Sequence, residues 1–397
     1  MPAPSRRGLD APSSPIRKLV PYADAARARG VNVLHLNIGQ PDIETPAVMR
    51  AALTDYHDTV IAYGPSGGDA PFREALFAYY RRLGHALSPS DLIVTTGGSE
   101  AVFFALAACL DPGDEIAIPD PMYANYIGYA QLLGIVVRPI PTTVESGYHL
   151  PQDLDACIGP KTRAVLICNP SNPTGAVYTD AEMAAVVDLC ARRDLFLIAD
   201  EVYREFVYEG PLPKSVLAYP ALGDRAVVVD SLSKRYSLCG ARIGCLVSRH
   251  SGVMASAMKF AQARLSPPAL AQVVAARATE LAPDFFDVAR DEYRRRRDTV
   301  FEGLKAIPGV LAHRPEGAFY QMARLPIDDG DTFVRFMLES FSKDGRTVMV
   351  APGAGFYAEP GRGTDEVRIA YVLNTDDLAL SMRLLGEGLE VYPGRRR

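Results

Sequence analysis

The pattern that most restricts the fold of this 397-residue chain is an alternation of short β-branched segments with longer helical ones. Strands are expected at residues 92–95, 115–118, 136–139, 164–168, 195–199 and 226–230. Helical stretches separate several of them, at 99–110, 125–133 and 180–193. Because strands separated by helices pair in parallel and are covered by those helices on both faces, the pattern predicts an α/β fold with a mostly parallel central sheet.

The sequence changes character after a helical stretch at 283–307. The residues beyond it predict a strand at 318–323, a helix at 332–343, strands at 348–351 and 366–371, and a final helix. These elements are typical of a smaller α+β domain. We therefore expect an N-terminal arm over residues 1–45 that joins the small domain, a large domain over 46–285 and a small C-terminal domain over 286–397.

Two local features of the sequence lead to separate predictions. The arm is rich in Pro, Ser and Arg and contains one short helix near residues 22–29. Four consecutive arginines at 294–297 lie within the long helical stretch. A run of like charges on a helix is typical of a solvated side, so we expect a charged, exposed helix face there.

Composition and charge exclude several classes of function. The net charge of −5 comes with no basic stripe, so a nucleic-acid partner is not expected. Cysteines and histidines are scattered without metal-ligand spacing, so no metal is expected. The longest apolar run, 101–110, is too short to cross a bilayer, and the first residues contain no apolar signal segment. We expect a cytoplasmic protein that does not bind membranes.

Five of the expected strands are followed by side chains that bind ligands. In an open parallel sheet, ligands bind beyond the carboxyl ends of the strands. The sequences at those ends are Gly97-Gly98-Ser99-Glu100, Pro121-Met122-Tyr123, the segment 169–175 with Asn172, Asp200-Glu201-Val202-Tyr203 and Ser231-Leu232-Ser233-Lys234. One edge of the sheet is therefore expected to present a phosphate cradle, an aromatic ring, an amide, a carboxylate with a phenol, and an amine.

These groups suit a phosphorylated pyridine aldehyde. Free N–H groups at a helix start behind two glycines bind phosphate, and Ser99 adds a hydroxyl donor. Tyr123 offers a flat face for stacking, and Asp200 would keep the pyridine nitrogen protonated. Asn172 and Tyr203 would donate hydrogen bonds to the ring phenolate. Lys234 would form a Schiff base with the aldehyde and, once substrate displaces it, transfer a proton.

Singly these signals are weak, because an aspartate at a strand end is often only a helix or turn cap, and most lysines are solvated surface charges. Together they resemble the class I/II aminotransferases of the fold-type I enzymes that use pyridoxal 5′-phosphate (PLP), which are aspartate aminotransferase-like. The resemblance extends from the motif at 37–42 to that at 367–369. Its strongest motifs are Asn172-Pro173-Thr174-Gly175, Asp200-Glu201-Val202-Tyr203 and Ser231-Leu232-Ser233-Lys234, with Arg242 eight residues on.

The resemblance implies a role for each site residue. The implied phosphate ligands are Gly98, Ser99, Ser231, Ser233 and Arg242. It also implies the ring contacts already given to Tyr123, Asp200, Asn172 and Tyr203, with Asn172 reaching the substrate as well. Arg368 matches the arginine that binds the substrate α-carboxylate, and Gly39 lies in the strip that closes over it. Tyr63 matches a tyrosine that reaches the phosphate of a partner subunit, so a homodimer is implied.

One position departs from part of this family. Some aspartate-specific members have a basic residue where Ser99 stands, which pairs with the second carboxylate of the substrate. Here that charge is missing. Recognition of dicarboxylates would therefore need another arginine or a mobile loop.

The expected activity is transfer of an amino group between amino acids and 2-oxo acids by ping-pong exchange, with PLP as cofactor. A β- or γ-eliminating lyase, such as a C–S lyase, would share every cofactor residue, because fold resemblance does not separate the two reactions. A non-catalytic PLP-sensing regulator is the third alternative. It would need a fused DNA-binding domain, and about 35 residues before the first motif leave no room for one.

Overall fold

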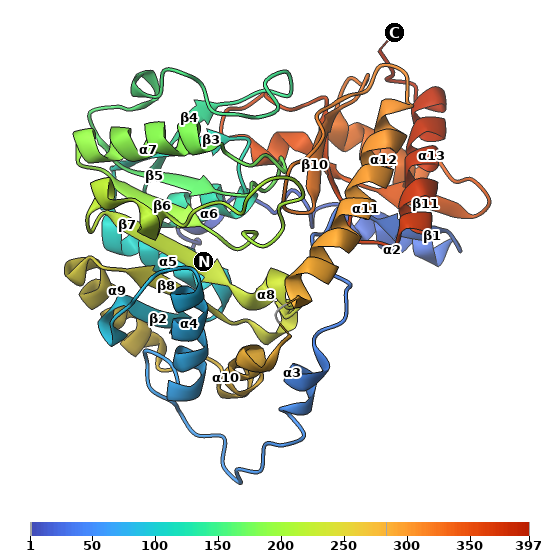
Figure 1. Cartoon of the computed structure of the whole chain (residues 1–397). Coiled ribbons are helices and arrows are strands. Elements are labelled where there is room, and N and C mark those ends of the chain that lie inside the picture. Colours follow the sequence, from blue (N-terminus) through green and yellow to red (C-terminus); the bar gives the residue numbers. More distant parts are fainter. Residues whose placement is uncertain (1, 283, 397) are drawn as a thin grey trace.

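Seven strands form the central sheet of the structure, a computed structural model that describes residues 2–282 and 284–396 (Figure 1). Their order is β2-β8-β7-β6-β5-β3-β4. The strands are β2 (Leu92–Thr95), β3 (Glu115–Asp120), β4 (Val136–Pro141), β5 (Thr162–Cys168), β6 (Phe196–Asp200), β7 (Ala226–Ser231) and β8 (Gly244–Ser248). Strands β3 to β7 pair in parallel, and only β8 runs antiparallel to its two neighbours, β2 and β7. The predicted, mostly parallel sheet is confirmed.

Helices cover both faces of this sheet because its central strands are apolar on both sides. Strand β7 is buried at every residue. Along β5 and β6, Leu166 and Ile198 belong to one hydrophobic cluster, and their neighbours Val165 and Leu197 belong to a second one. The first cluster includes α5 (Gly97–Cys109), α6 (Ala124–Leu133) and α9 (Ser251–Arg264). The second includes α4 (Ala70–Arg82), α7 (Asp180–Arg193) and α10 (Ala269–Ala276). This two-sided burial is typical of parallel sheets.

A second group of strands lies beside the central sheet, to the right in Figure 1. It contains a four-stranded antiparallel sheet, β12-β13-β10-β9, and the parallel pair β1-β11. Its strands are β1 (Asn32–His35), β9 (Leu311–Ala312), β10 (Tyr320–Arg324), β11 (Arg346–Met349), β12 (Ala351–Pro352) and β13 (Glu366–Ala370). Its helices are α2 (Val20–Ala28), α11 (Phe285–Lys305), α12 (Gly330–Glu339) and α13 (Thr375–Val391). The arm thus pairs, through β1, with a strand more than 300 residues away in sequence.

Three short helices complete the described α-helices, α1 (Arg6–Asp10), α3 (Ala47–Ala51) and α8 (Leu232–Arg235). The predicted elements agree with the observed ones to within a few residues. Pro283, the start of the stretch predicted as helical, lies outside the described residues, as do Met1 and Arg397 at the ends of the predicted domains. The domain boundaries at residues 45 and 285 stay predictions. Among the described helices, none is long and apolar enough to cross a membrane.

The expectation of an exposed arginine face on α11 is wrong for two of its four residues. Arg294 and Arg295 are exposed, but Arg297 is fully buried and Arg296 nearly so. Their charges are matched by carboxylates from distant parts of the chain, Asp42 for Arg296 (2.5 Å) and Glu209 for Arg297 (2.8 Å). Each arginine also pairs within α11, Arg296 with Glu292 and Arg297 with Asp298, both at 2.8 Å. A buried charge is tolerated when it is paired in this way, and the partners Asp42 and Glu209 lie outside the helix sequence.

Candidate active site

A cavity of about 740 Å³ opens at the carboxyl ends of the central strands. It is lined by every site residue predicted from the sequence except Tyr63. These residues are Gly39, Gly98, Ser99, Tyr123, Asn172, Asp200, Tyr203, Ser231, Ser233, Lys234, Arg242 and Arg368. Residues that are far apart in the sequence therefore meet in one place, as the strand-end pattern predicts.

An anion cradle forms where α5 begins. Gly97 has φ +72°, and a Cβ atom there would lie 2.6 Å from Nη2 of Arg242. The missing side chain therefore lets the guanidinium approach the start of the helix, where N–H groups are free. The Arg242 side chain is fixed by a hydrogen bond from Nη1 to the Cys239 carbonyl oxygen (3.0 Å). Arg242 and the helix N-terminus together provide a place for a phosphate-sized anion.

Two serine hydroxyls line the same cavity as this cradle. The Ser231 Oγ atom is 2.9 Å from Ser233 Oγ, and both side chains are buried. Ser231 also packs close to α5, because a Cβ atom at Gly98 would lie 3.3 Å from its Cβ. Glycine at 98 and the small serine therefore keep the end of β7 in contact with the helix start. These hydroxyls can donate to the same anion as Arg242.

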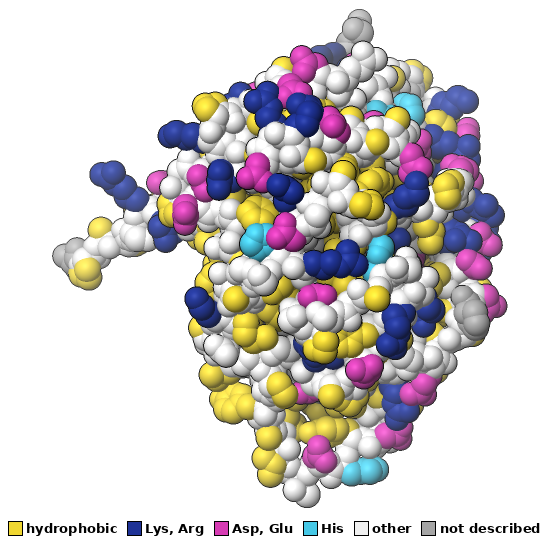
Figure 2. Space-filling view, turned by 60° about the vertical axis from the view of Figure 1, so that its left-hand side comes forward, with side chains coloured by type: hydrophobic (Ala, Val, Ile, Leu, Met, Phe, Trp, Pro, Cys, Tyr) yellow, Lys and Arg dark blue, Asp and Glu magenta, His cyan; other side chains and the backbone are white. Residues whose placement is uncertain are grey.

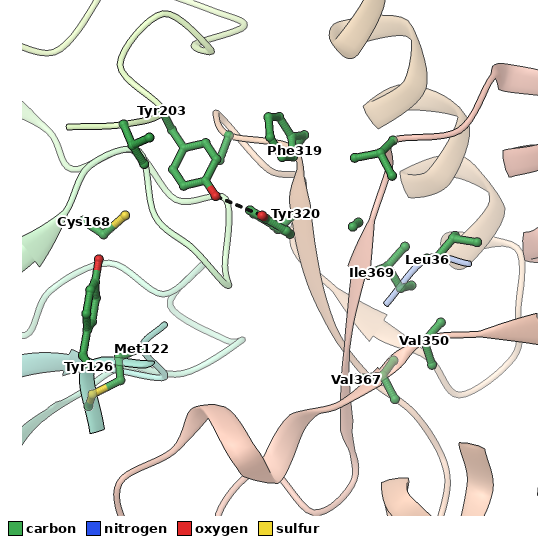
Figure 3. Packing of buried hydrophobic residues seen from close by; sticks show 14 of the residues in the cluster. Leu36, Met122, Tyr126, Cys168, Tyr203, Phe319, Tyr320, Val350, Val367 and Ile369 are labelled. Carbon is green, nitrogen blue, oxygen red and sulfur yellow. Dashed lines mark hydrogen bonds between the residues drawn. The ribbon is translucent and has the colours of Figure 1, made fainter. Parts of the chain in front are cut away.

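Asp200 lies at the end of β6 and accepts a hydrogen bond from the Tyr126 hydroxyl (2.6 Å). The Val202 amide donates to its other oxygen (3.2 Å). Burial raises the pKa of Asp200 to about 6, and the hydrogen bond from Tyr126 opposes this rise. Figure 3 shows Tyr126 rising from α6 toward Cys168. A buried carboxylate of this kind suits a cationic partner such as a protonated pyridine nitrogen.

Tyr126 is absent from the sequence prediction, although a signal for it existed. It follows Tyr123, the N-cap residue of α6, by three residues, and residues at this spacing lie on the same side of a helix. The two rings meet edge to face at 5.4 Å between centroids. This spacing from Tyr123 indicates that Tyr126 also reaches the cavity, where its hydroxyl binds Asp200.

Lys234 is held inside the cavity by two neutral partners. Its Nζ atom donates to the Gly39 carbonyl oxygen (2.7 Å) and lies 3.9 Å from the sulfur of Cys239. Within the described residues, no carboxylate forms an ion pair with it. An amine that is bound only to a carbonyl and a thiol remains available as a nucleophile or a base.

Arg368, on β13, is a buried cation that stacks between two aromatic rings. Its guanidinium carbon is 4.5 Å from the Tyr320 ring centroid and 4.6 Å from that of Phe356. Nη1 donates to the Asn172 side-chain oxygen (3.0 Å) and Nη2 to the Asn37 carbonyl oxygen (2.8 Å). Asn172 lines the cavity, and because its side-chain oxygen accepts here, its amide nitrogen remains available as a donor.

The Arg368 guanidinium has no carboxylate partner among the described residues, and its buried Nε atom has no hydrogen-bond acceptor. Burial lowers the pKa of Arg368. A buried cation with a free donor is costly unless an anion compensates it. The arrangement therefore suits a ligand carboxylate.

Tyr203 and Tyr320 form a hydroxyl pair next to this cation. Their oxygens are 2.9 Å apart and both rings are buried (Figure 3). Tyr320 comes from β10, outside the central sheet, and was not predicted. Its hydroxyl fills the space beside Gly39, since a Cβ atom at Gly39 would clash with it. Only glycine allows the strip at residue 39 to pass this close.

The geometry defines an α/β enzyme whose cavity joins an anion cradle, a buried carboxylate, an amine and an anion-binding arginine. Residues 31–380 match the model of the family "Aminotransferase class I and II". The chain belongs to this family.

Several characterised proteins are similar to this chain over nearly its whole length. The aspartate/prephenate aminotransferase of Thermus thermophilus is 33% identical over 372 residues, which cover 91% of this chain and 93% of the relative. The aspartate aminotransferase of Bacillus subtilis is 29% identical over 379 residues, with 93% and 92% covered.

Solved structures agree with the sequence relatives. The aspartate aminotransferase of Thermus thermophilus with maleate superposes with a TM-score of 0.86 at 30% identity, covering 98% of this chain and 100% of that one. The alanine aminotransferase of Pyrococcus furiosus gives 0.87 at 28% identity, with 97% and 99% covered. The predicted fold and the predicted class of enzyme, a PLP-dependent aminotransferase, are confirmed.

Proposed function

We propose that this cavity holds PLP and that the chain transfers amino groups between amino acids and 2-oxo acids by ping-pong exchange. The observation that carries the proposal is that Lys234, Asp200 and Arg368 line one cavity together with the anion cradle at the start of α5. The residues fit the cofactor, because the cradle and the buried carboxylate match its two charged ends. When bound, PLP would supply the electron sink that allows the Cα–H bond of an amino acid to break.

Each predicted ligand has an assigned contact in this proposal. The proposed phosphate ligands are Gly98, Ser99, Ser231, Ser233 and Arg242. Tyr123 would stack on the ring, and Asp200 would hold the pyridine nitrogen in its protonated form. Asn172 and Tyr203 would donate to the ring oxygen, and the Tyr320 hydroxyl would orient that of Tyr203.

The reacting groups of the chain have separate tasks. Arg368 would bind the α-carboxylate with the two parallel hydrogen bonds that a guanidinium forms. This contact would direct the Cα–H bond toward Lys234. The Lys234 amine would then remove the Cα proton and keep it on the same side of the substrate. Gly39 would hold the amine through its carbonyl oxygen until substrate arrives.

The test of this function is a half-reaction with an unactivated amino acid. Holoenzyme mixed with alanine or glutamate should release one equivalent of 2-oxo acid per active site and lose its PLP absorbance. Added 2-oxoglutarate should restore that absorbance. Ammonia and pyruvate from a β-substituted substrate, with no half-reaction on any unactivated amino acid, would instead support an eliminating lyase.

A pH dependence follows from the Tyr126 hydrogen bond to Asp200. Asp200 must be a carboxylate to pair with a protonated pyridine nitrogen, so PLP affinity should fall as pH falls through about 6, the pKa of Asp200. Tyr126→Phe removes a bond that favours the carboxylate and should raise this pKa further. We expect PLP to bind about 5- to 10-fold more weakly than to wild type at pH 6, the effect of roughly one hydrogen bond, with a smaller difference at pH 8. Absorbance titrations at each pH would measure it.

Tyr129→Phe is the matched control, because Tyr129 also lines the cavity but donates no hydrogen bond to Asp200. It should leave the pH dependence unchanged. Equal pH profiles for Tyr126→Phe and wild type would contradict the assigned role of Asp200.

We further propose that the chain forms a homodimer in which Tyr63 reaches the partner's phosphate site. Tyr63 lies outside its own cavity, and 82% of its surface is exposed. It belongs to an open loop between α3 and α4 that also exposes Val60 and Ile61, at the bottom of Figure 1. In Figure 2, hydrophobic side chains gather on this lower part of the molecule. Exposed apolar groups in this number suit an interface.

Ile61→Asp should convert the dimer to monomers and lower activity at least about 10-fold, because a charge at an apolar interface is costly. Sedimentation analysis would measure the change. Val391→Asp, at a similarly exposed aliphatic residue of α13, is the control and should stay dimeric. A fully active, PLP-loaded monomer would contradict the proposal.

We also propose a cytoplasmic location for the protein and a division of the chain into a large and a small domain. All six cysteines are free thiols, which suits a reducing compartment such as the cytoplasm. The pairing of β1 with β11 supports the placement of the arm with the small domain, 286–397. The large domain would then be 46–285, which contains the central sheet.

A further inference from the structure

The N-terminal arm contributes a cation to the cavity. Ser14, Ile16 and Arg17 line it together with the predicted site residues. The Arg17 side chain is exposed, and within the described residues it forms no hydrogen bond or ion pair. Its neighbour Lys18 differs, because its Nζ atom pairs with Asp331 at 2.7 Å. Arg17 is therefore a charged group at the mouth of the cavity with no partner in the described chain.

The backbone around Arg17 is fixed. Pro15 is buried against Gly355, where a Cβ atom would lie 2.2 Å from the Cβ of Pro15. Leu19 is buried in the core, with 3% of its surface exposed. The Arg17 amide donates to the carbonyl oxygen of Ser14 (3.2 Å). Anchors on both sides keep Arg17 at the cavity, so less entropy is lost when its side chain binds a ligand.

The lining of the cavity carries more positive than negative charge. Among the described residues that line the cavity, four side chains are cationic and one, Asp200, is a carboxylate. The cations are Arg17, Lys234, Arg242 and Arg368. In the proposed function Lys234 reacts, Arg242 binds phosphate and Arg368 binds the α-carboxylate. Arg17 is the remaining cation, and an excess of positive charge attracts a ligand with a further negative group.

We propose that Arg17 binds the second carboxylate of dicarboxylic amino acids and 2-oxo acids, and so determines donor preference. This inference rests on the proposed function of the cavity. The Ser14 hydroxyl and the Asn125 amide line the same cavity and offer additional donors. Ser99 carries no charge, so Arg17 of the arm supplies the positive charge that this position lacks. A guanidinium binds a carboxylate through two parallel hydrogen bonds, which suits this task.

Arg17→Ala should lower kcat/KM for aspartate and glutamate by about 10- to 100-fold, the usual effect of losing a charge-assisted hydrogen bond. The value for alanine, which has no second carboxylate, should change less than about 2-fold, as expected for a surface substitution. Arg17→Glu should lower the dicarboxylate values further, because like charges repel. Lys18→Ala is the matched control and should affect all three substrates equally.

A binding measurement separates recognition from turnover. Calorimetry should show that Arg17→Ala lowers the affinity for succinate by a similar factor. The affinity for butyrate, which has the same chain length and one carboxylate, should be unchanged. Equal losses for alanine and aspartate, or none for either, would overturn the inference. A wild-type enzyme that transaminates only monocarboxylic amino acids would also overturn it while leaving the proposed function intact. A wild-type enzyme with no half-reaction on any amino acid would instead refute the proposed function.

Discussion

Lys234→Ala should lower the rate of transamination by at least about 10³-fold, because it removes the proposed nucleophile and proton carrier together. Among the described residues that line the cavity, Lys234 is the only lysine, so no nearby amine replaces it. The bond to the Gly39 carbonyl oxygen is also lost. Single-turnover mixing with alanine or glutamate would measure the effect directly.

Lys214→Ala provides the matched control. Lys214 pairs with Asp180 on the surface, and its removal should leave the rate within about 2-fold of wild type. Borohydride reduction of wild-type holoenzyme, followed by peptide mapping, should place the pyridoxyl group on Lys234. A pyridoxyl group on Lys214 or Lys259, or near-normal turnover by Lys234→Ala, would contradict the assignment of the active site.

Arg368→Ala should raise KM for every amino acid, since the α-carboxylate is common to all of them. Loss of one partner of a desolvated charge pair costs about 2–5 kcal/mol, so kcat/KM should fall by roughly 30- to 5000-fold. Arg368→Lys should recover only part of this loss, because an ammonium group does not reproduce the guanidinium fork. Steady-state kinetics over a panel of amino acids would measure both variants.

Thermal unfolding is the necessary control, because Arg368 is buried and stacked on Tyr320 and Phe356. A variant that unfolds near the wild-type temperature and still binds PLP separates lost recognition from lost structure. If the kinetic loss were confined to acidic amino acids, Arg368 would recognise the side chain instead of the α-carboxylate.

The sequence predicts the central fold well because the signals there are local. Each parallel strand is a short apolar run, and each helix has its own boundary signals. In α7, for example, Thr179 and Glu182 form a capping box at the residue where the helix was expected to begin. The site residues at the ends of central strands could be predicted for the same reason, because each lies at the end of a strand or within four residues of it. Gly39, Arg242 and Arg368 were predicted from the family resemblance instead.

The features that sequence reasoning missed depend on contacts between distant segments. Strand β8 was not predicted, because its five residues follow directly from the motif around Arg242, and its antiparallel direction depends on pairing with β2 and β7. Tyr320 enters the site from another sheet. The buried state of Arg297 depends on Glu209, 88 residues away. Local propensity contains no information about such partners.

The proposed cofactor-binding residues and the proposed substrate-selecting residue Arg17 lie in different segments of the chain. This separation matters for evolution and redesign. Apart from Tyr63, the proposed cofactor ligands lie between residues 98 and 242, close to strand ends of the central sheet. Arg17 and Gly39 come from the arm, whose strand β1 pairs with β11 and not with that sheet. Substitutions near Arg17, away from Gly39, would therefore change substrate preference and leave the residues proposed for catalysis unchanged. A library confined to residues 12–18 should diversify donor preference at little cost in cofactor affinity.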